Sequence, residues 1–248
     1  MKEYAFACFS TKYVIKLDAK EELASSIALK CFEICKNLHL KYNYFDKNSL
    51  VSKINQRDKN RIKLDKESQK ILEITLKLSE ITDFAFDITL INKKLENNAI
   101  YGKNAFILDK RFIEFSDLKT QIDLGGVIKE YAVDECAKIC EKYPFIINFG
   151  GDLKTNKNIF VNLKNPKNPS EAIKKVNINN LALTTSGLYE RANHIINTQD
   201  FKYNQVSVIG KNALNCGVFS TALCFKDFEL PKEYQAILID FDNLIYEK

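Results

Sequence analysis

The spacing of apolar residues changes along the chain, and each spacing predicts a different element. Between residues 3 and 17, apolar residues alternate with polar ones or run together, which predicts one or two strands. Between 21 and about 40 they recur every three or four positions, as on the buried face of a helix. The polar stretch 45–60 predicts a loop, and Asp65 is a suitable cap for a second helix that runs to Ile81.

Strand patterns dominate the second half of the chain. Strands are expected at 105–108 and 112–115, and helices after Gly125-Gly126 and at about 213–225. Further strand patterns lie at 145–149, 159–163, 176–178, 181–184, 205–209, 236–241 and 244–246. Because helices and strands mix without regular βαβ alternation, we predict an α+β fold with a mainly antiparallel sheet and flanking helices. The length suits a single domain over 1–248, or two intimately joined subdomains.

Composition narrows the class of protein. Hydrophobic residues make up 46% of the chain and charged residues 28%, which favours a folded globular protein over a disordered one. The net charge of +5 comes from evenly spread lysines, so we expect no nucleic-acid partner. No apolar run reaches about 18 residues, so no membrane span is expected. The polar start indicates a cytoplasmic protein, or a periplasmic one if an export signal has been removed.

Half of the eight glycines lie in two pairs, Gly125-Gly126 and Gly150-Gly151. Such pairs indicate backbone conformations or close approaches that a side chain would prevent. The first pair follows Asp123 and opens a predicted helix with Lys129 in its first turn, an arrangement suited to phosphate. A plain strand-to-helix turn is the alternative. We expect both pairs to meet at a single cleft.

Two further clusters suit an anionic ligand, although each is also compatible with an ordinary turn. The first is Ala85-Phe86-Asp87 with Thr89. The second begins with Ser186-Gly187 and continues to Arg191 and His194.

Six segments in the same order resemble the motifs of the FAD:protein FMN transferase (ApbE-like) family. They are Asn48-Ser-Leu-Val-Ser-Lys-Ile-Asn55, Thr82-Asp-Phe-Ala-Phe-Asp-Ile-Thr89, Asp123-Leu-Gly-Gly-Val-Ile-Lys-Glu-Tyr-Ala-Val-Asp134, Asn148-Phe-Gly-Gly-Asp152, Thr185-Ser-Gly-Leu-Tyr189 with His194-Ile-Ile196, and Ser220-Thr-Ala-Leu223. Order and spacing agree from about residue 6 to residue 225. The resemblance implies a flavin-transferase fold, T-fold-like, over the whole chain.

The resemblance also implies a reaction and a set of site residues. In the family FAD lies in a cleft, Mg²⁺ bridges its pyrophosphate, and FMN passes to a Ser or Thr of an acceptor protein. The positions that match FAD-binding ones are Phe9, Phe45, Ala85, Phe86, Asp87, Asp123, Lys129, Ser186, Gly187 and Ile195. His194 is the candidate for assisting the transfer, because histidine titrates near neutral pH. The carbonyl of Gly126 and the hydroxyl of Thr221 match metal-ligand positions.

The chain departs from the family pattern at the metal site. The family motif Asp-Ala-x-x-Thr places a carboxylate one helical turn before the threonine, whereas Gly217 precedes Thr221 here. Loss of that carboxylate should weaken Mg²⁺ binding, and Gly217→Asp is expected to restore it. Glu130 replaces a usual glycine beside Lys129 and is a further source of negative charge. Phe84 also replaces a family glycine.

Three functional interpretations follow. The first is an Mg²⁺-dependent FMN transferase enzyme, and the second is a catalytically impaired relative that binds FAD or a partner protein. The third is a metal-binding protein that uses Cys31 with Cys35 and Cys136 with Cys140, each pair on one helical face. Because the same spacing marks the buried face of each helix, we favour core packing for these thiols. Zinc content of the purified protein tests that preference.

Overall fold

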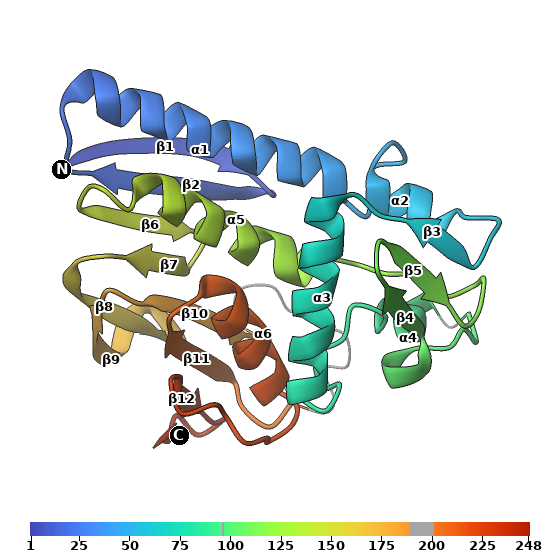
Figure 1. Ribbon diagram of the computed structural model, residues 1–248. Coiled ribbons are helices and arrows are strands. Elements are labelled where there is room, and N and C mark those ends of the chain that lie inside the picture. The colour runs from blue at the N-terminus through green and yellow to red at the C-terminus, as the bar shows by residue number, and fades with distance from the viewer. Residues whose placement is uncertain (96, 189–200) are drawn as a thin grey trace. The chain divides into compact units, whose positions relative to one another are not determined.

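The computed structural model describes residues 1–95, 97–188 and 201–248 (Figure 1). The chain divides into two compact units, and each is described by itself. The first unit comprises Met1–His39 and Val127–Lys248, and the second comprises Leu40–Gly126. The expectation of a single domain, with joined subdomains as its alternative, stays a prediction.

Antiparallel strands build the first unit. Its main sheet has the order β1-β2-β6-β7-β10-β11-β12-β13 in the described residues, with every neighbouring pair antiparallel. The strands are β1 Lys2–Cys8, β2 Thr11–Leu17, β6 Phe145–Phe149, β7 Asp152–Thr155, β10 Ala182–Gly187, β11 Gln205–Gly210, β12 Gln235–Ile239 and β13 Ile245–Glu247. A separate hairpin consists of β8 Asn158–Asn165 and β9 Asn168–Asn179.

Three helices accompany this sheet. They are α1 Glu21–Tyr42, α5 Gly125–Cys140 and α6 Ala213–Leu223; the end of α1 and the first two residues of α5 belong to the second unit. Figure 1 shows α1 running beside the β1–β2 hairpin, and the rings of Phe6 in β1 and Phe32 in α1 meet edge to face at 5.2 Å. The helix α6 contacts β10 and β11.

Alternation along β10 shows how the sheet divides its two faces. Ser186 bonds to Ser220 of α6, whereas Leu183, of opposite parity, packs with Leu163 and Ile178 of the β8–β9 hairpin. The helices and the hairpin therefore cover opposite faces of this part of the sheet. On the helix side, Tyr13 of β2 and Phe149 of β6 face each other across the strands with ring centroids 3.8 Å apart.

The second unit combines short helices with a small sheet. Its elements are α2 Leu50–Asn55, β3 Arg61–Lys63, α3 Lys66–Ile81, α4 Ile91–Leu95, the 3-10 helix η1 Gly102–Asn104, β4 Phe106–Asp109 and β5 Phe112–Phe115. The strand order is β3-β5-β4, antiparallel throughout. Asp65 caps α3 as predicted, because its carboxylate accepts the Ser68 N–H at 2.9 Å.

The predicted α+β class with a mainly antiparallel sheet is confirmed. The sequence did not predict α2, α4, β3 or β7, which are only three to six residues long. The prediction of a loop over 45–60 was wrong at α2. Ser49 caps this helix by accepting the Ser52 N–H at 3.0 Å. In the part of the chain that the structure describes, no helix combines the length and apolar character needed to cross a bilayer.

Candidate functional site

Two tight hairpin turns lie at the same end of the main sheet, because β2 pairs with β6. Gly150 and Gly151 connect β6 to β7 with φ of +64° and +103°. A Cβ at Gly150 would lie only 2.5 Å from Thr11 Oγ1, so this position has no room for a side chain. The second glycine pair therefore serves backbone geometry and close packing, as its sequence indicated.

The neighbouring turn reaches a similar conformation without glycine. Phe9 and Ser10 connect β1 to β2 with φ of +49° and +58°. A non-glycine residue in the left-handed region costs about 1–2 kcal/mol. The half-buried Phe9 ring is held by Tyr13, stacked at 6.1 Å, and by the edge of His39 at 4.8 Å. Its predicted contact with flavin stays a prediction.

Lys129 lies beside two buried carboxylates in the first unit. Its Nζ is 2.5 Å from Oδ2 of Asp152, the first residue of β7, and 3.6 Å from Oε1 of Glu130. The side chains of Asp152 and Glu130 are 3% and 8% exposed. Lys129 was predicted to hold a polar part of FAD, and the structure adds a partner for it. Sequence reasoning included Asp152 in a motif but assigned it no role.

Asp134 of α5 caps the beginning of α6. Its two carboxylate oxygens accept the N–H groups of Ala213 and Leu214, each at 3.0 Å, and Lys154 pairs with it at 2.6 Å. This anion at the helix N-terminus accepts N–H groups that have no partner within the helix, and it interacts favourably with the helix dipole. Sequence reasoning missed this role, since Asp134 entered only as the end of a motif.

Glu130 fills the space beside Gly217. A Cβ placed on Gly217 would lie 2.7 Å from Glu130 Cγ and 3.2 Å from its Cδ. Glu130 is 6% exposed, and its Oε2 has no hydrogen-bond partner. The expectation that Gly217→Asp alone restores a ligand is therefore corrected, because an aspartate there cannot fit unless Glu130 moves.

A hydroxyl cluster joins β10 to α6 near Gly217. Ser186 Oγ lies 2.8 Å from Ser220 Oγ and 3.0 Å from Thr221 Oγ1, while Ser220 also donates to the Gly217 carbonyl at 3.0 Å. The structure thus brings together Ser186, predicted for FAD, and Thr221, predicted for the metal. Gly187 ends β10 and is half-buried.

In the second unit, the predicted residues make local contacts. Asp87 accepts the N–H and O–H of Thr89 at 2.8 and 2.9 Å, and its burial raises the pKa of the carboxyl. The Phe86 ring packs over Gly126, where a Cβ would come within 3.3 Å of it. Ala85 is half-buried and donates its N–H to the Thr82 carbonyl at 3.0 Å.

The turn before α5 belongs to this unit as well. Asp123 accepts the Gly125 N–H at 2.8 Å, and burial raises the pKa of its carboxyl. Phe84, which stands where the family has glycine, takes φ of +55°. The Phe45 side chain is 86% exposed, so its ring is available to stack on a flat ligand.

Some expectations are not tested. His194 and Ile195 lie outside the described residues. Gly125-Gly126 belong to the second unit and Gly150-Gly151 to the first, so their meeting at one cleft stays a prediction.

The four helical cysteines form one cluster. Cys31 Sγ lies 4.0 Å from Cys140 Sγ, and Cys35 Sγ lies 3.8 Å from Cys136 Sγ. All four are free thiols with 0% exposure, which supports core packing between α1 and α5. Among the described residues, no group of three or more His, Cys, Asp or Glu side chains has a geometry that could hold a metal ion.

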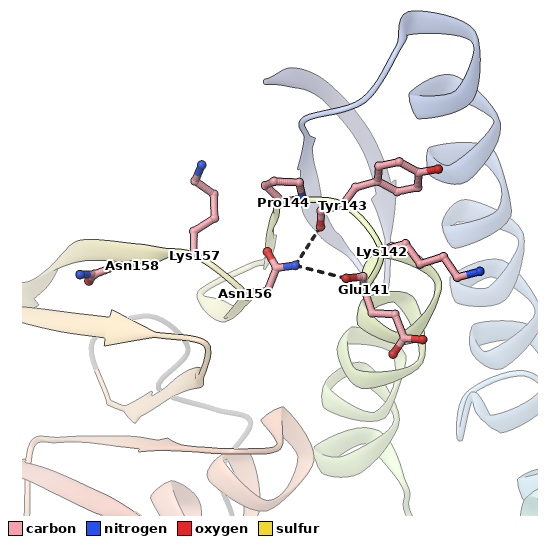
Figure 2. Close-up of a pocket in the computed structure, with 7 residues that line it drawn as sticks. All are labelled: Glu141, Lys142, Tyr143, Pro144, Asn156, Lys157 and Asn158. Atoms are coloured by element: carbon pink, nitrogen blue, oxygen red, sulfur yellow. Dashed lines mark hydrogen bonds between the residues drawn. The ribbon is translucent and has the colours of Figure 1, made fainter.

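A surface pocket of about 470 Å³ lies at the end of α5 and the start of β8 (Figure 2). It is lined by Glu141, Lys142, Tyr143, Pro144, Asn156, Lys157 and Asn158. Asn156 donates to the carbonyls of Tyr143 at 2.8 Å and Glu141 at 3.5 Å and accepts the Phe145 N–H at 2.8 Å. These bonds fasten the loop after α5, and none of the predicted site residues lines the pocket.

Fold and local geometry place the protein in a class of α+β proteins whose solved representatives include flavin transferases. The crystal structure of the ApbE protein of Thermotoga maritima matches with a TM-score of 0.89 and 21% identity, covering 100% of this chain and 96% of that one. The flavin transferase ApbE of Vibrio cholerae matches with 0.84 and 16% identity, covering 100% and 96%. The apo flavinyl transferase ApbE of Pseudomonas stutzeri matches with 0.78 and 17%, covering 100% and 95%.

The sequence profile of the ApbE family matches residues 9–94 and 91–236. This chain belongs to the ApbE family. A search among curated proteins found no match.

Proposed function

We propose that this protein is a flavin transferase that moves FMN from FAD to a Ser or Thr hydroxyl of an acceptor protein, with Mg²⁺. Family membership and the shared fold support flavin transfer. One observation supports the proposal for this chain in particular. The buried carboxylate of Glu130, whose Oε2 has no hydrogen-bond partner, lies beside Gly217. Gly217 in turn precedes Thr221 by one turn of α6. Such oxygen donors suit a divalent cation and its bound diphosphate.

The reaction breaks the phosphoanhydride bond between the two halves of FAD and forms a phosphoester bond to the acceptor. The acceptor oxygen forms a bond to the phosphorus of the FMN half of FAD, and the bond from that phosphorus to the bridging oxygen breaks. AMP leaves with the bridging oxygen, and the acceptor hydroxyl loses its proton. His194 is the residue we propose to take that proton.

Two described side chains support the proposal of a cation at this place. Glu130 Oε2 is a buried acceptor without a partner, and the Thr221 hydroxyl is a neutral oxygen ligand. We propose that both hold Mg²⁺. The Gly126 carbonyl stays a candidate donor on the strength of the family resemblance alone. When bound, the ion would neutralise negative charge on the diphosphate.

Other residues would hold FAD itself. Phe45 offers an exposed ring for stacking, and Lys129 offers a cation for phosphate. Phe9, Ala85, Phe86, Asp87, Asp123, Ser186, Gly187 and Ile195 are proposed contacts on the strength of the family resemblance.

The alternative is a catalytically impaired relative that binds FAD or a partner protein. Gly217 favours that alternative, since it removes the carboxylate of the family motif. The buried Glu130 beside it weakens the argument, because a carboxylate is still present at this place.

The test is FAD turnover by the purified protein. With FAD, Mg²⁺ and a serine- and threonine-containing acceptor peptide, we expect one AMP released for each FMN attached, and no product with EDTA. His194→Ala should retain FAD binding and lose AMP release. Bound FAD without AMP release by the unmodified protein would favour the impaired relative.

A further inference from the structure

We propose that Glu130 of α5 supplies the metal-binding carboxylate that the family carries at position 217 of α6. Relative to the family pattern, α5 carries an acid at 130 in place of glycine, and α6 carries glycine at 217 in place of an acid. This inference rests on the proposed function, since it concerns the cation of the same site.

The first argument is steric. The space that a side chain at 217 would enter is already occupied by the methylene and carboxyl carbons of Glu130, at 2.7 and 3.2 Å from an added Cβ. A Glu130 side chain in this conformation requires glycine at 217. The two departures from the family pattern therefore form one coupled exchange.

The second argument is electrostatic. Glu130 is 6% exposed, and its Oε2 lacks a hydrogen bond. Burial of a carboxylate with an unsatisfied oxygen is unfavourable unless a counter-charge is present. The Lys129 ammonium is 3.6 Å from the other oxygen, beyond hydrogen-bond distance, and lies closer to Asp152 at 2.5 Å. A divalent cation would satisfy the remaining oxygen.

The third argument is position. Gly217 and Thr221 are one turn apart on α6 and share a face of the helix. Because Glu130 lies against Gly217, its carboxylate is on the face of α6 from which Thr221 projects. Ser186, at 3.0 Å from Thr221 Oγ1, adds a further hydroxyl to the group.

The experiment is a titration of the full-length protein with Mn²⁺ alone, followed by electron paramagnetic resonance and calorimetry. Glu130→Gln keeps the size of the side chain and should weaken binding by about tenfold or more, since even outer-shell partners of metals contribute that much. Glu135→Gln, on the same helix and paired with Lys138, is the matched control and should bind as the unmodified protein does.

The exchange variant makes the test specific. Glu130→Gly should lose Mn²⁺ affinity, and the double variant Glu130→Gly with Gly217→Asp should regain most of it. Gly217→Asp alone should not gain affinity, because Glu130 occupies its space. Thermal unfolding of each variant separates loss of ligand from loss of fold.

The outcomes separate this inference from the proposed function. Unchanged Mn²⁺ affinity in Glu130→Gln, no Mn²⁺ binding by the unmodified protein, or no recovery in a folded double variant would each overturn the carboxylate exchange. A parallel FAD titration tests the proposed function. If Mn²⁺ affinities of the variants are as expected but FAD does not bind, the proposed function is wrong and the carboxylate exchange still stands.

Discussion

At the scale of single residues, Lys129 makes a structural ion pair in addition to its proposed role in FAD binding. It is the residue proposed to meet the FAD phosphates, and its ammonium already lies 2.5 Å from the buried carboxylate of Asp152. A cation in such a place stabilises the fold, because its removal leaves an uncompensated buried charge. The sequence predicted Lys129 as a ligand-binding residue from the glycine pair before it, but its partner is on a strand more than twenty positions later.

Lys129→Ala should lower the free energy of unfolding by about 3 kcal/mol or more, in addition to weakening FAD binding. Urea denaturation measures the first effect and calorimetry the second. Lys129→Ala with Asp152→Asn removes the unpaired charge and should recover part of the stability. If Lys129→Ala unfolds at the same urea concentration as the unmodified protein, the ion pair has no structural role.

Gly150 and Gly151 provide a matched comparison of steric clash and backbone strain. Both have positive φ, but a Cβ meets Thr11 only at Gly150 and meets nothing within 4 Å at Gly151. Gly151→Ala should cost about 1–2 kcal/mol of stability from strain. Gly150→Ala should cost more, and Thr11→Ala should relieve part of the difference. Equal losses of stability in the two alanine variants, measured by thermal unfolding, would contradict the packing of Thr11.

At the scale of elements, α5 orients α6 through a side chain. The Asp134 carboxylate receives two N–H groups at the start of α6, whose own N-cap residue, Asn212, makes no side-chain cap bond. Because Glu130 is on α5 and Thr221 on α6, the same contact helps to fix the proposed ligands in one arrangement.

Asp134→Ala should lower stability by about 1–2 kcal/mol through the lost cap, with a further loss from the unpaired Lys154. Glu135→Ala is the control, because its pair with Lys138 is exposed and should contribute less than about 1 kcal/mol. Chemical denaturation of both variants makes the comparison. A loss no larger than that of Glu135→Ala would show that α6 does not depend on this cap.

Long periodic elements were predictable from the sequence, and short ones were not. The helix α3 repeats its apolar positions over four turns after a capping aspartate, and the strand β6 was placed at its observed bounds. By contrast, α2 is too short to show a helical period, and β7 carries Asp152 and Lys154 on the face turned to α5. Because charged residues occupy positions that are usually apolar in a central strand, the sequence of β7 does not show a strand pattern.

At the scale of the whole molecule, motif order identified the family, but pairings between distant segments required coordinates. Asp134 bonds to Ala213 and Leu214, and Glu130 packs against Gly217, across separations that no periodicity encodes. The sequence indicated both departures, at 130 and at 217, without showing that they touch. Because of this contact, we no longer expect Gly217→Asp alone to add a ligand.

FAD should bind more tightly than riboflavin, because Lys129 and the proposed cation act on the diphosphate. Loss of a charged hydrogen bond costs about 1.5–3 kcal/mol, so the ratio of affinities should exceed about tenfold. Calorimetry with both ligands, in the presence of Mg²⁺, provides the values. Equal affinities would contradict recognition of the diphosphate.

The most direct measurement of the central claim follows the two phosphorus atoms of FAD through the reaction. FAD carrying radiolabelled phosphorus in either its FMN half or its AMP half is incubated with the protein, Mg²⁺ and an acceptor peptide. We predict that label from the FMN half becomes attached to the peptide and that label from the AMP half is released as AMP. FMN transfer would be contradicted if label from the AMP half became attached to the peptide, or if the peptide carried no label from either half.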